Sequence, residues 1–504
     1  TVAVASPSPA DLPQWAGHPA GLRSLFFTEM WERFSYYGMR ALLVLIMVDQ
    51  VESGGLALSD PVATAIYGLY TAAVYLLALP GGWTADRLHG AQTAIWIGGI
   101  EIMLRHFTLA IPSVYAFFLR LMLVASGTGL LKPNISAVVG QLYRPGDGRR
   151  DAGFTLFYMG INIGAFAGSI ICGYLAENEA FGWHYGFAAA GVGMLFGLWQ
   201  FRRTRELLGD AGLKPHLDPD KPGDRERIAQ GWRVVGTIGA LILLVLLLLV
   251  TGVWRPDPVA MSRYTSGVIL GLAAAYFAWL FAFGGLSGDE KRRLVVIIAL
   301  FLGAAMFWAG FEQAGSSLNL FADRYTDRFI GDFEMPASWL QSTNPIMIIL
   351  IAPLFAALWA WLAGRHLEPS TPVKFGFGLI LLGVGFGVMF FAARLVAVGN
   401  PVLPVWLITT YLFHTLGELA LSPVGLSATT KLAPRRYVGQ MMGVWFVGAA
   451  LGNVLAGLLA GELAGENVEQ MPELYLQIVT TSVGSGIVLL LCTPFLRKLM
   501  GDVH

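Results

Sequence analysis

The first apolar segment of the chain contains a cluster of glutamates, arginines and tyrosines. These residue types can bind a charged ligand or carry a proton. With 3.6 residues per helical turn, one face of a helix there presents all of them together. They are Glu29, Glu32, Arg33, Tyr36, Tyr37 and Arg40. An ion at the centre of a bilayer costs at least about 2.5–3.5 kcal/mol, so such a face normally lines a water-filled path or meets another polar helix. The cluster therefore predicts a route for a solute through a membrane.

The same cluster also has a plainer interpretation as an ion pair between neighbouring turns, which stabilises a helix by roughly 0.2–0.5 kcal/mol. One pair would not require two carboxylates, a second arginine and two tyrosines on one face. A guanidinium presents paired donors that match a carboxylate, so we expect Arg33 to bind a carboxylate of the solute. We expect Glu29 or Glu32 to change its protonation during the transport cycle.

The composition places the whole chain in a membrane. Of 504 residues, 55% are hydrophobic and only 13% are charged, and the formal net charge is zero, which gives no indication of a nucleic-acid partner. The two cysteines, Cys172 and Cys492, are too few for a disulfide framework, and we expect both to be packing residues. The first apolar segment is too long and too charged for a cleavable signal peptide.

Fourteen segments are long and apolar enough to span a bilayer, which takes about 20 residues. They cover approximately 24–48, 62–84, 92–111, 114–141, 150–174, 183–201, 232–252, 265–285, 292–318, 339–363, 372–396, 404–430, 436–462 and 474–498. An even number of spans puts both termini on one side. Loops on that side carry most of the lysines and arginines, whereas the opposite loops are acidic, so we expect both termini in the cytoplasm.

The longest polar, proline-rich stretch divides the chain after six helices. We expect an all-α integral membrane protein with two six-helix halves and an accessory two-helix hairpin, which is the plan of the major facilitator fold. The expected parts are a cytoplasmic tail at 1–23, an N-terminal half at 24–201, a cytoplasmic linker at 202–231, the hairpin at 232–285 and a C-terminal half at 292–498.

Five motifs occur in order along both halves, and together they resemble the proton-dependent oligopeptide transporter (POT) family. They are Glu29-x-x-Glu32-Arg33-Phe34-x-Tyr36-Tyr37-Gly38, Gly81-Gly82-x-x-Ala85-Asp86-Arg87-x-x-Gly90, Gly127-x-Gly129-x-x-Lys132-Pro133-Asn134, Phe157-Tyr158-x-x-Ile161-Asn162-x-Gly164 and Gly417-Glu418-x-x-Leu421-Ser422-Pro423-x-Gly425. The second is the general loop motif of the major facilitator superfamily. The resemblance spans about residues 22–498.

The resemblance implies a proton-coupled symporter that imports di- and tripeptides by alternating access, with no cofactor other than the proton gradient. It assigns the peptide carboxylate to Arg33, Tyr37 and Lys132, and proton coupling to Arg33 with the two first-helix glutamates. It also implies a bacterial inner membrane protein that is a monomer by default. An alternative is the same fold carrying another small solute, nitrate or an amino-acid derivative, although two acids beside Arg33 disfavour an anion.

Three further charges lie deep in predicted helices, at Lys132, Glu312 and Glu418. A lysine so far from a helix end is poorly placed to extend to the membrane surface. The resemblance implies that Lys132 and Glu418 line the peptide site and pair across the halves as a gate when the inner side is shut. It implies that Glu312 takes part in proton coupling and either receives the peptide amino terminus or balances the first-helix arginine. Many bacterial members have a second acid just before this position, where the present chain has Phe311.

Neutral amides and aromatic residues complete the expected peptide site. Asn162 and Asn344 match the donor and acceptor of a peptide bond, although amides in membrane helices often only bridge helices. The resemblance places both at the peptide backbone. It also places four aromatic residues at the side-chain pockets, where packing is the alternative: Tyr36, Tyr75, Trp308 and Trp445.

An outer gate is expected at Arg40, one turn beyond the tyrosines, with Asp323 or Asp327 as its partner. Asp86 and Arg87 belong to a conformational loop, and we expect His106 and His414 to pack or link helices. The sequence contains no catalytic constellation, metal-binding spacing, phosphate-binding glycine loop or nucleophile elbow. It therefore disfavours an enzyme and an ATP-driven pump.

Four buried acids face two buried bases, and this imbalance motivates the predicted mechanism. The acids are Glu29, Glu32, Glu312 and Glu418, and the bases are Arg33 and Lys132. In a medium of low dielectric constant this surplus cannot all stay ionised, so at least one carboxylate should carry a proton in some state. A zwitterionic peptide would replace ion pairs between the halves and allow them to move.

Overall fold

The computed structural model describes residues 14–107, 114–144, 147–463 and 468–501. Contacts divide the chain into two compact units, and each is described by itself. Unit 1 contains residues 1–39, 76–176 and 184–256. Unit 2 contains residues 40–75, 177–183 and 257–504. The helices α1 and α2 are each shared between the units, and the last residue of α5 and the first residue of α6 belong to unit 2.

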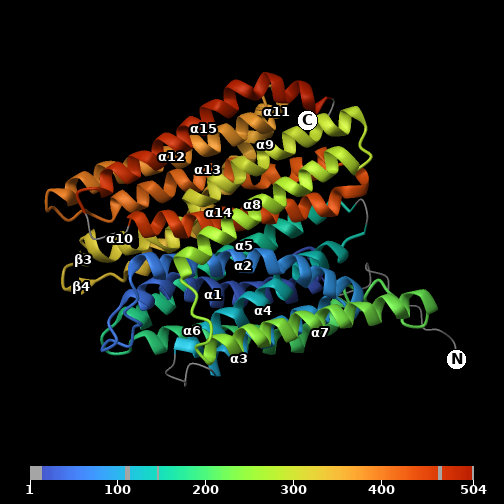
Figure 1. Ribbon diagram of the computed structural model, residues 1–504, viewed down its shortest axis with the longest axis horizontal. Helices are drawn as coiled ribbons and strands as arrows, with labels where there is room; N and C mark the ends of the chain where they lie inside the picture. Colours follow the sequence, from blue (N-terminus) through green and yellow to red (C-terminus); the bar gives the residue numbers. More distant parts are fainter. Residues whose placement is uncertain (1–13, 108–113, 145–146, 464–467, 502–504) are drawn as a thin grey trace. The chain divides into compact units, whose positions relative to one another are not determined.

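Unit 1 consists of long helices with two short turns of other helix types and one small hairpin (Figure 1). Its elements are β1 (Gln14–Trp15) paired with β2 (His18–Pro19), most of α1 (Gly21–Val48), the end of α2 (Asp60–Thr84), the π-helical turn η1 (Ala85–His89), α3 (Ala91–Phe107), α4 (Val114–Gln141), α5 (Arg150–Glu177), α6 (Trp183–Thr204), the 3₁₀ turn η3 (Arg205–Leu208) and α7 (Pro222–Val250).

Glycines on α5 bring it close to the charged stretch of α1. A side chain at Gly164 would collide with the backbone of Met30, and one at Gly168 would collide with Phe34. On the other side of this interface Gly38 faces the buried Cys172. Because small residues let helix backbones approach closely, this seam fixes the position of the α1 charges in unit 1.

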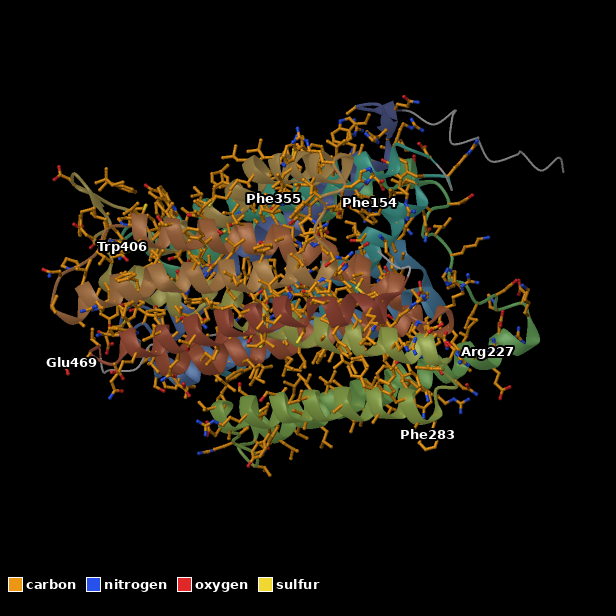
Figure 2. All side chains as sticks on the ribbon, turned by 90° about the horizontal axis from the view of Figure 1, so that it is seen from above. Phe154, Arg227, Phe283, Phe355, Trp406 and Glu469 are labelled. Carbon is orange, nitrogen blue, oxygen red and sulfur yellow. The ribbon has the colours of Figure 1, made fainter. Side chains whose placement is uncertain are left out.

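The helix α7 begins at Pro222, ten residues before the apolar segment that predicts it. Its first turns carry charged residues such as Arg227, labelled in Figure 2, which a search for apolar residues does not detect. Part of the predicted linker is therefore helical. Along the apolar part of α7 no residue of the best spanning window is buried, as expected for a helix that faces lipid.

Unit 2 contains the remaining helices, with another small hairpin between two of them (Figure 1). Its elements are the end of α1, most of α2, α8 (Pro258–Phe283), α9 (Gly288–Phe311), the 3₁₀ turn η4 (Glu312–Gly315), α10 (Ser317–Tyr325), β3 (Phe329–Ile330) paired with β4 (Phe333–Glu334), the 3₁₀ turn η5 (Ala337–Ser342), α11 (Thr343–Gly364), α12 (Thr371–Ala397), α13 (Val405–Leu432), the 3₁₀ turn η6 (Arg435–Tyr437), α14 (Val438–Leu463) and α15 (Met471–Met500).

The predicted helix at 292–318 is not continuous. The α-helix ends at Phe311, and Glu312 begins the 3₁₀ turn that leads into α10. Glycine and serine at positions 315 and 316 favour such a break, and Ser317 Oγ donates to Gln313 Oε1 at 2.8 Å. The break therefore places Glu312 at a helix terminus rather than in a regular helix, a position that hydropathy alone does not reveal.

Ten helices in the described residues are long and apolar enough to cross a membrane. Of the other long helices, α3 is one residue too short for this criterion at 17 described residues, and α1, α6 and α13 are less apolar over any 18-residue window or carry more charge. Most exposed side chains on α8 are apolar, and Phe283 at its end is 77% exposed (Figure 2). Apolar surface of this kind suits contact with lipid.

Candidate functional site

The charges of α1 form a buried ion triad in unit 1. Arg33 Nε lies 2.9 Å from Glu29 Oε1 and 2.6 Å from Glu32 Oε2. The three side chains are between 1% and 3% exposed. The two carboxylates compensate the positive charge of the buried arginine. When both acids are ionised, the triad has a net charge of −1.

Helix α4 adds two groups to this triad. Thr128 Oγ1 donates to Glu32 Oε1 at 3.3 Å, so the two oxygens of Glu32 have different partners. Lys132, one helical turn after Thr128, acts on the same carboxylate through its charge. Tyr36 lies beneath the guanidinium, with its ring centroid 5.3 Å from Arg33 Cζ, and packs edge-on against Tyr37. The sequence-predicted residues of α1 and α4 are thus brought together within unit 1.

Arg40 belongs to unit 2, where it meets Glu312 and Tyr67. Arg40 Nη2 lies 2.5 Å from Glu312 Oε2, and Arg40 Nε donates to the Tyr67 hydroxyl at 2.5 Å. The prediction that Asp323 or Asp327 pairs with Arg40 is wrong. Asp323 lies on α10 beyond the helix break and faces Arg328 at 3.4 Å, whereas Glu312 at the break is turned toward Arg40.

Asp327 instead accepts a hydrogen bond from the backbone N–H of Phe329, two residues later. It is therefore a turn residue rather than a gate partner.

Glu418 is buried in α13 beside Asn344 of α11. Asn344 Nδ2 donates to Glu418 Oε2 at 3.1 Å and to Thr415 Oγ1 at 3.0 Å. The charges of Glu312 and Arg40 also act on Glu418. Unit 2 therefore gathers an arginine, two glutamates and an asparagine, all of them predicted site residues.

The aromatic candidates are packed rather than exposed. Trp308 touches Phe307 and Phe311 edge-on, and Trp445 packs against Phe375 and Gly425. In the described part of the chain, the buried Nε1 of Trp308 has no hydrogen-bond partner, which is unusual because an unsatisfied buried donor costs about 1–3 kcal/mol. This donor is suited to a ligand oxygen.

The remaining predicted residues have more local surroundings. Asn162 is buried, and its amide donates to the backbone oxygen of Tyr158 on the same helix at 2.9 Å. Tyr75 is half-buried on α2. His414 is buried between the rings of Phe386 and Phe311, so it packs as expected. The side chain of His106 lies outside the described residues.

The loop at Asp86 is held by the segment that follows α6. The backbone N–H of His216 donates to Asp86 O at 2.6 Å, and Gln92 Nε2 donates to Ala211 O at 2.8 Å. A side chain at Gly90, whose φ is +80°, would meet the backbone of Leu213. The conformational loop is therefore covered by residues 209–216 within unit 1.

Sequence reasoning missed three residues that contact the predicted site. Thr128 and Thr415 lie one turn from Lys132 and Glu418 or closer, so their helical spacing was an available signal. Tyr67, the partner of Arg40, had no such signal because it lies on a different helix from both Arg40 and Glu312.

Comparison with known proteins decides the class to which this arrangement belongs. A protein-family model described as "PTR2: POT family" matches residues 92–215 and 274–473. The chain belongs to the POT family. It is 41% identical to the peptide transporter YePEPT of Yersinia enterocolitica, over 97% of this chain and 96% of that protein. It is 36% identical to a di-/tripeptide transporter of Lactococcus lactis, over 97% of this chain and 98% of that protein.

Solved structures of POT family members have the same fold. A peptide transporter POT in complex with sulfate matches with a TM-score of 0.89 and 39% identity, over 98% of both chains. A POT family transporter in complex with 5-aminolevulinic acid matches with a TM-score of 0.87 and 31% identity, over 97% of this chain and 100% of that one. The predicted major facilitator fold is confirmed, and the chain is a membrane transporter.

Proposed function

We propose that this POT family member imports di- and tripeptides together with protons by alternating access. The observation that carries the proposal is the buried triad of Arg33 with Glu29 and Glu32, which combines a carboxylate receptor with two proton acceptors. Relatives named as peptide and di-/tripeptide transporters align over nearly the whole chain. The proton gradient drives uptake, and no cofactor or metal takes part.

The charges of unit 1 link proton binding to substrate binding. With Lys132 added, the triad contains two acids and two bases, so its formal charge is zero. A peptide carboxylate arriving at Arg33 and Lys132 adds one negative charge. Protonation of Glu32 or Glu29 restores neutrality and also releases Arg33 for the ligand, because a neutral acid binds a guanidinium less strongly. Peptide carboxylate and proton therefore favour each other's binding.

The charges of unit 2 suit the other end of a zwitterion. Arg40, Glu312 and Glu418 sum to one negative charge, which a peptide ammonium would neutralise. Glu312 then serves both the ligand and Arg40, so binding of the ammonium weakens the Arg40 ion pair. Asn344 and Trp308 supply neutral hydrogen-bonding groups for the peptide backbone or side chains.

The arrangement in the membrane follows from charge. We place both termini in the cytoplasm, because basic residues concentrate in the loops on the side of the termini. As the family resemblance implies, we also place the protein in a bacterial inner membrane as a monomer. The end of α1 at Val48 then faces the outside. There Arg40 and the ion pair of Arg324 with Asp60, at 2.6 Å, connect helices of the two halves within unit 2.

A second candidate solute is an amino-acid derivative, because a POT family relative of 31% identity was solved with 5-aminolevulinic acid. That compound also carries an ammonium and a carboxylate, but it has no peptide bond. Nitrate is disfavoured, since Glu29 and Glu32 would repel an anion that brings no positive charge.

Uptake of labelled di-alanine into proteoliposomes tests the proposal. Accumulation with an inward proton gradient that collapses with a protonophore, while downhill exchange persists, is the expected result. Competition by unlabelled di-alanine, 5-aminolevulinic acid and nitrate identifies the solute class. Accumulation unaffected by the protonophore, or exchange blocked only by 5-aminolevulinic acid or nitrate, would overturn the proposal.

A further inference from the structure

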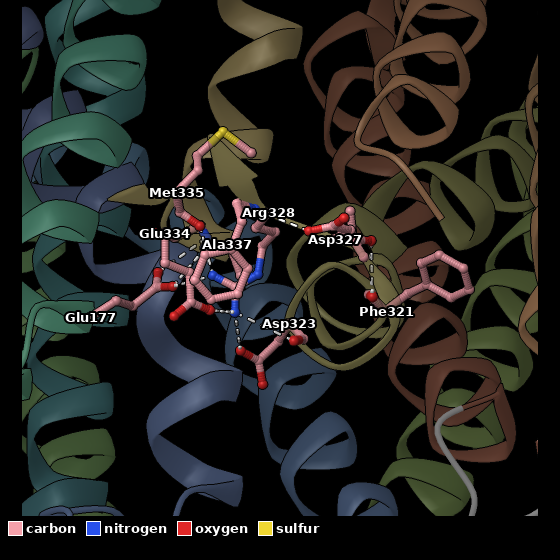
Figure 3. Close-up of polar contacts among 11 residues, drawn as sticks. Glu177, Phe321, Asp323, Asp327, Arg328, Glu334, Met335 and Ala337 are labelled. Carbon is pink, nitrogen blue, oxygen red and sulfur yellow. Dashed lines mark hydrogen bonds and ion pairs between the residues drawn. The ribbon is translucent and has the colours of Figure 1, made fainter. Parts of the chain in front are cut away.

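Glu177, the last residue of α5, accepts hydrogen bonds from the segment that follows α10 (Figure 3). We assign this contact to the outer side of the membrane. Glu177 Oε2 accepts the backbone N–H of Ala337 at 2.6 Å, and Oε1 accepts that of Ser338 at 3.1 Å. Its side chain is 12% exposed. The contact is specific because both donors are backbone N–H groups, whose positions are fixed by the fold, and both bind one carboxylate.

The other side of this contact is held together by Arg328 (Figure 3). Arg328 Nη1 donates to Met335 O at 2.6 Å, and Nη2 lies 2.8 Å from Glu334 and 3.4 Å from Asp323. Glu177 lies farther away, with Oε2 at 4.0 Å from Nη1. We call residues 328–338 the outer socket. Its arginine also pairs with Glu334 of the outer socket and with Asp323 of α10, so Arg328 keeps acidic partners when Glu177 leaves.

The division of the chain shows which part of α5 makes this contact. Residues 150–176 of α5 belong to unit 1, and the boundary falls between Ala176 and Glu177. The contact of Glu177 with Ala337 and Ser338 therefore lies within unit 2. In a transporter whose halves move, a contact made only by a helix end can break without repacking the rest of the helix.

We propose that Glu177 is a gating residue: its carboxylate docks on the N–H groups of Ala337 and Ser338 to hold the outer side closed, and it leaves the outer socket when that side opens. This inference rests on the alternating access of the proposed function. Arg328 faces three carboxylates, of Glu177, Asp323 and Glu334. Departure of Glu177 into water relieves their mutual repulsion, and this offsets part of the cost of the lost hydrogen bonds.

Chemical labelling from the outside measures this equilibrium directly. The reporter is Thr64→Cys in a background in which Cys172 and Cys492 are serine. Thr64 is fully buried where α2 packs on Gly461 of α14, within unit 2. It becomes accessible to a membrane-impermeant maleimide only when these helices separate.

Two variants remove the contact from opposite sides. Glu177→Gln keeps the shape of the side chain but removes its charge, and Ala337→Pro removes one backbone donor. Proline fits there because residue 337 begins a 3₁₀ turn and Pro336, at φ −53° and ψ 135°, has the conformation that a following proline requires. The matched control is Glu179→Gln, an exposed acid two residues away.

Each of the two variants should raise the labelling rate about tenfold, because Glu177→Gln replaces charged hydrogen bonds by neutral ones and Ala337→Pro removes one hydrogen bond to the carboxylate. The double variant should exceed the single ones only slightly, because both remove the same contact, and Glu179→Gln should label like the parent protein. Labelling at the parental rate in both variants, or a lowered melting temperature as the only change, would overturn the proposal. Absence of peptide uptake by the parent protein would instead refute the proposed function, since labelling needs no peptide.

Discussion

Replacement of Glu32 by glutamine should separate peptide movement from proton movement. Glu32 is 1% exposed, with Oε2 at 2.6 Å from Arg33 Nε and Oε1 accepting from Thr128 at 3.3 Å. Glutamine has the same shape, and its carbonyl oxygen can accept the hydrogen bond from Thr128. The substitution therefore preserves packing but removes a charge and a proton-binding group.

The charge sum gives the size of the expected effect. Without Glu32, the group of Glu29, Arg33 and Lys132 has a formal charge of +1, and a peptide carboxylate brings it to zero without a proton. A proton crossing 100 mV supplies about 2.3 kcal/mol, which corresponds to roughly fifty-fold accumulation. We expect Glu32→Gln to lower the ratio of internal to external peptide concentration to about one, while exchange of peptide continues.

The assay compares gradient-driven uptake with exchange of labelled di-alanine in the same proteoliposomes. Glu101→Gln is the matched control, because Glu101 is another membrane acid of unit 1, bonded to Ser126 Oγ at 2.7 Å on α3 and α4. It should accumulate peptide like the parent protein. Full accumulation by Glu32→Gln would refute the assignment of proton coupling to Glu32. An equal loss of accumulation in Glu101→Gln would show that the effect is not specific to Glu32.

Three further substitutions test other parts of the site. Lys132→Gln should raise the di-alanine concentration for half-maximal exchange about tenfold or more and leave that for di-alanine amide nearly unchanged, as competition measurements would show. Equal weakening of both ligands would contradict a role at the carboxylate. Glu312→Gln should lower the free energy of unfolding by about 3–5 kcal/mol, because it leaves Arg40 buried with its charge uncompensated, and denaturation in detergent measures this loss. A loss below about 1 kcal/mol would argue against the Arg40 ion pair. Asp60→Asn should cost less than about 1 kcal/mol in the same measurement, since its partner Arg324 is 32% exposed, and a larger loss would count against that reasoning.

The sequence predicted the features that depend on local spacing. The triad was predictable because charges within an apolar helix must share a face, and Arg33 is four residues from Glu29 and adjacent to Glu32. The fold followed from the count and order of apolar segments. The effect of the Lys132 charge on Glu32 was not predicted, because it joins two helices, and the resemblance had assigned Lys132 to the peptide carboxylate and to a pair with Glu418.

Features that depend on contacts between distant segments were not predictable. The break at Glu312 redirects that side chain to Arg40, whereas the predicted partner was Asp323 or Asp327 at the end of a continuous helix. Tyr67 reaches Arg40 from α2. Glu177 binds backbone N–H groups, which every residue except proline has, so no side-chain pattern could indicate its partners.

Binding of peptide and proton at one site is tested most directly by peptide-driven proton movement. Liposomes containing the protein and a pH-sensitive dye are prepared at equal internal and external pH, with the membrane potential clamped at zero, and di-alanine is added outside. We expect the interior to acidify, and we expect Glu32→Gln to take up the peptide without acidification. Peptide entry into liposomes of the parent protein with no change of internal pH would contradict binding of both at one site.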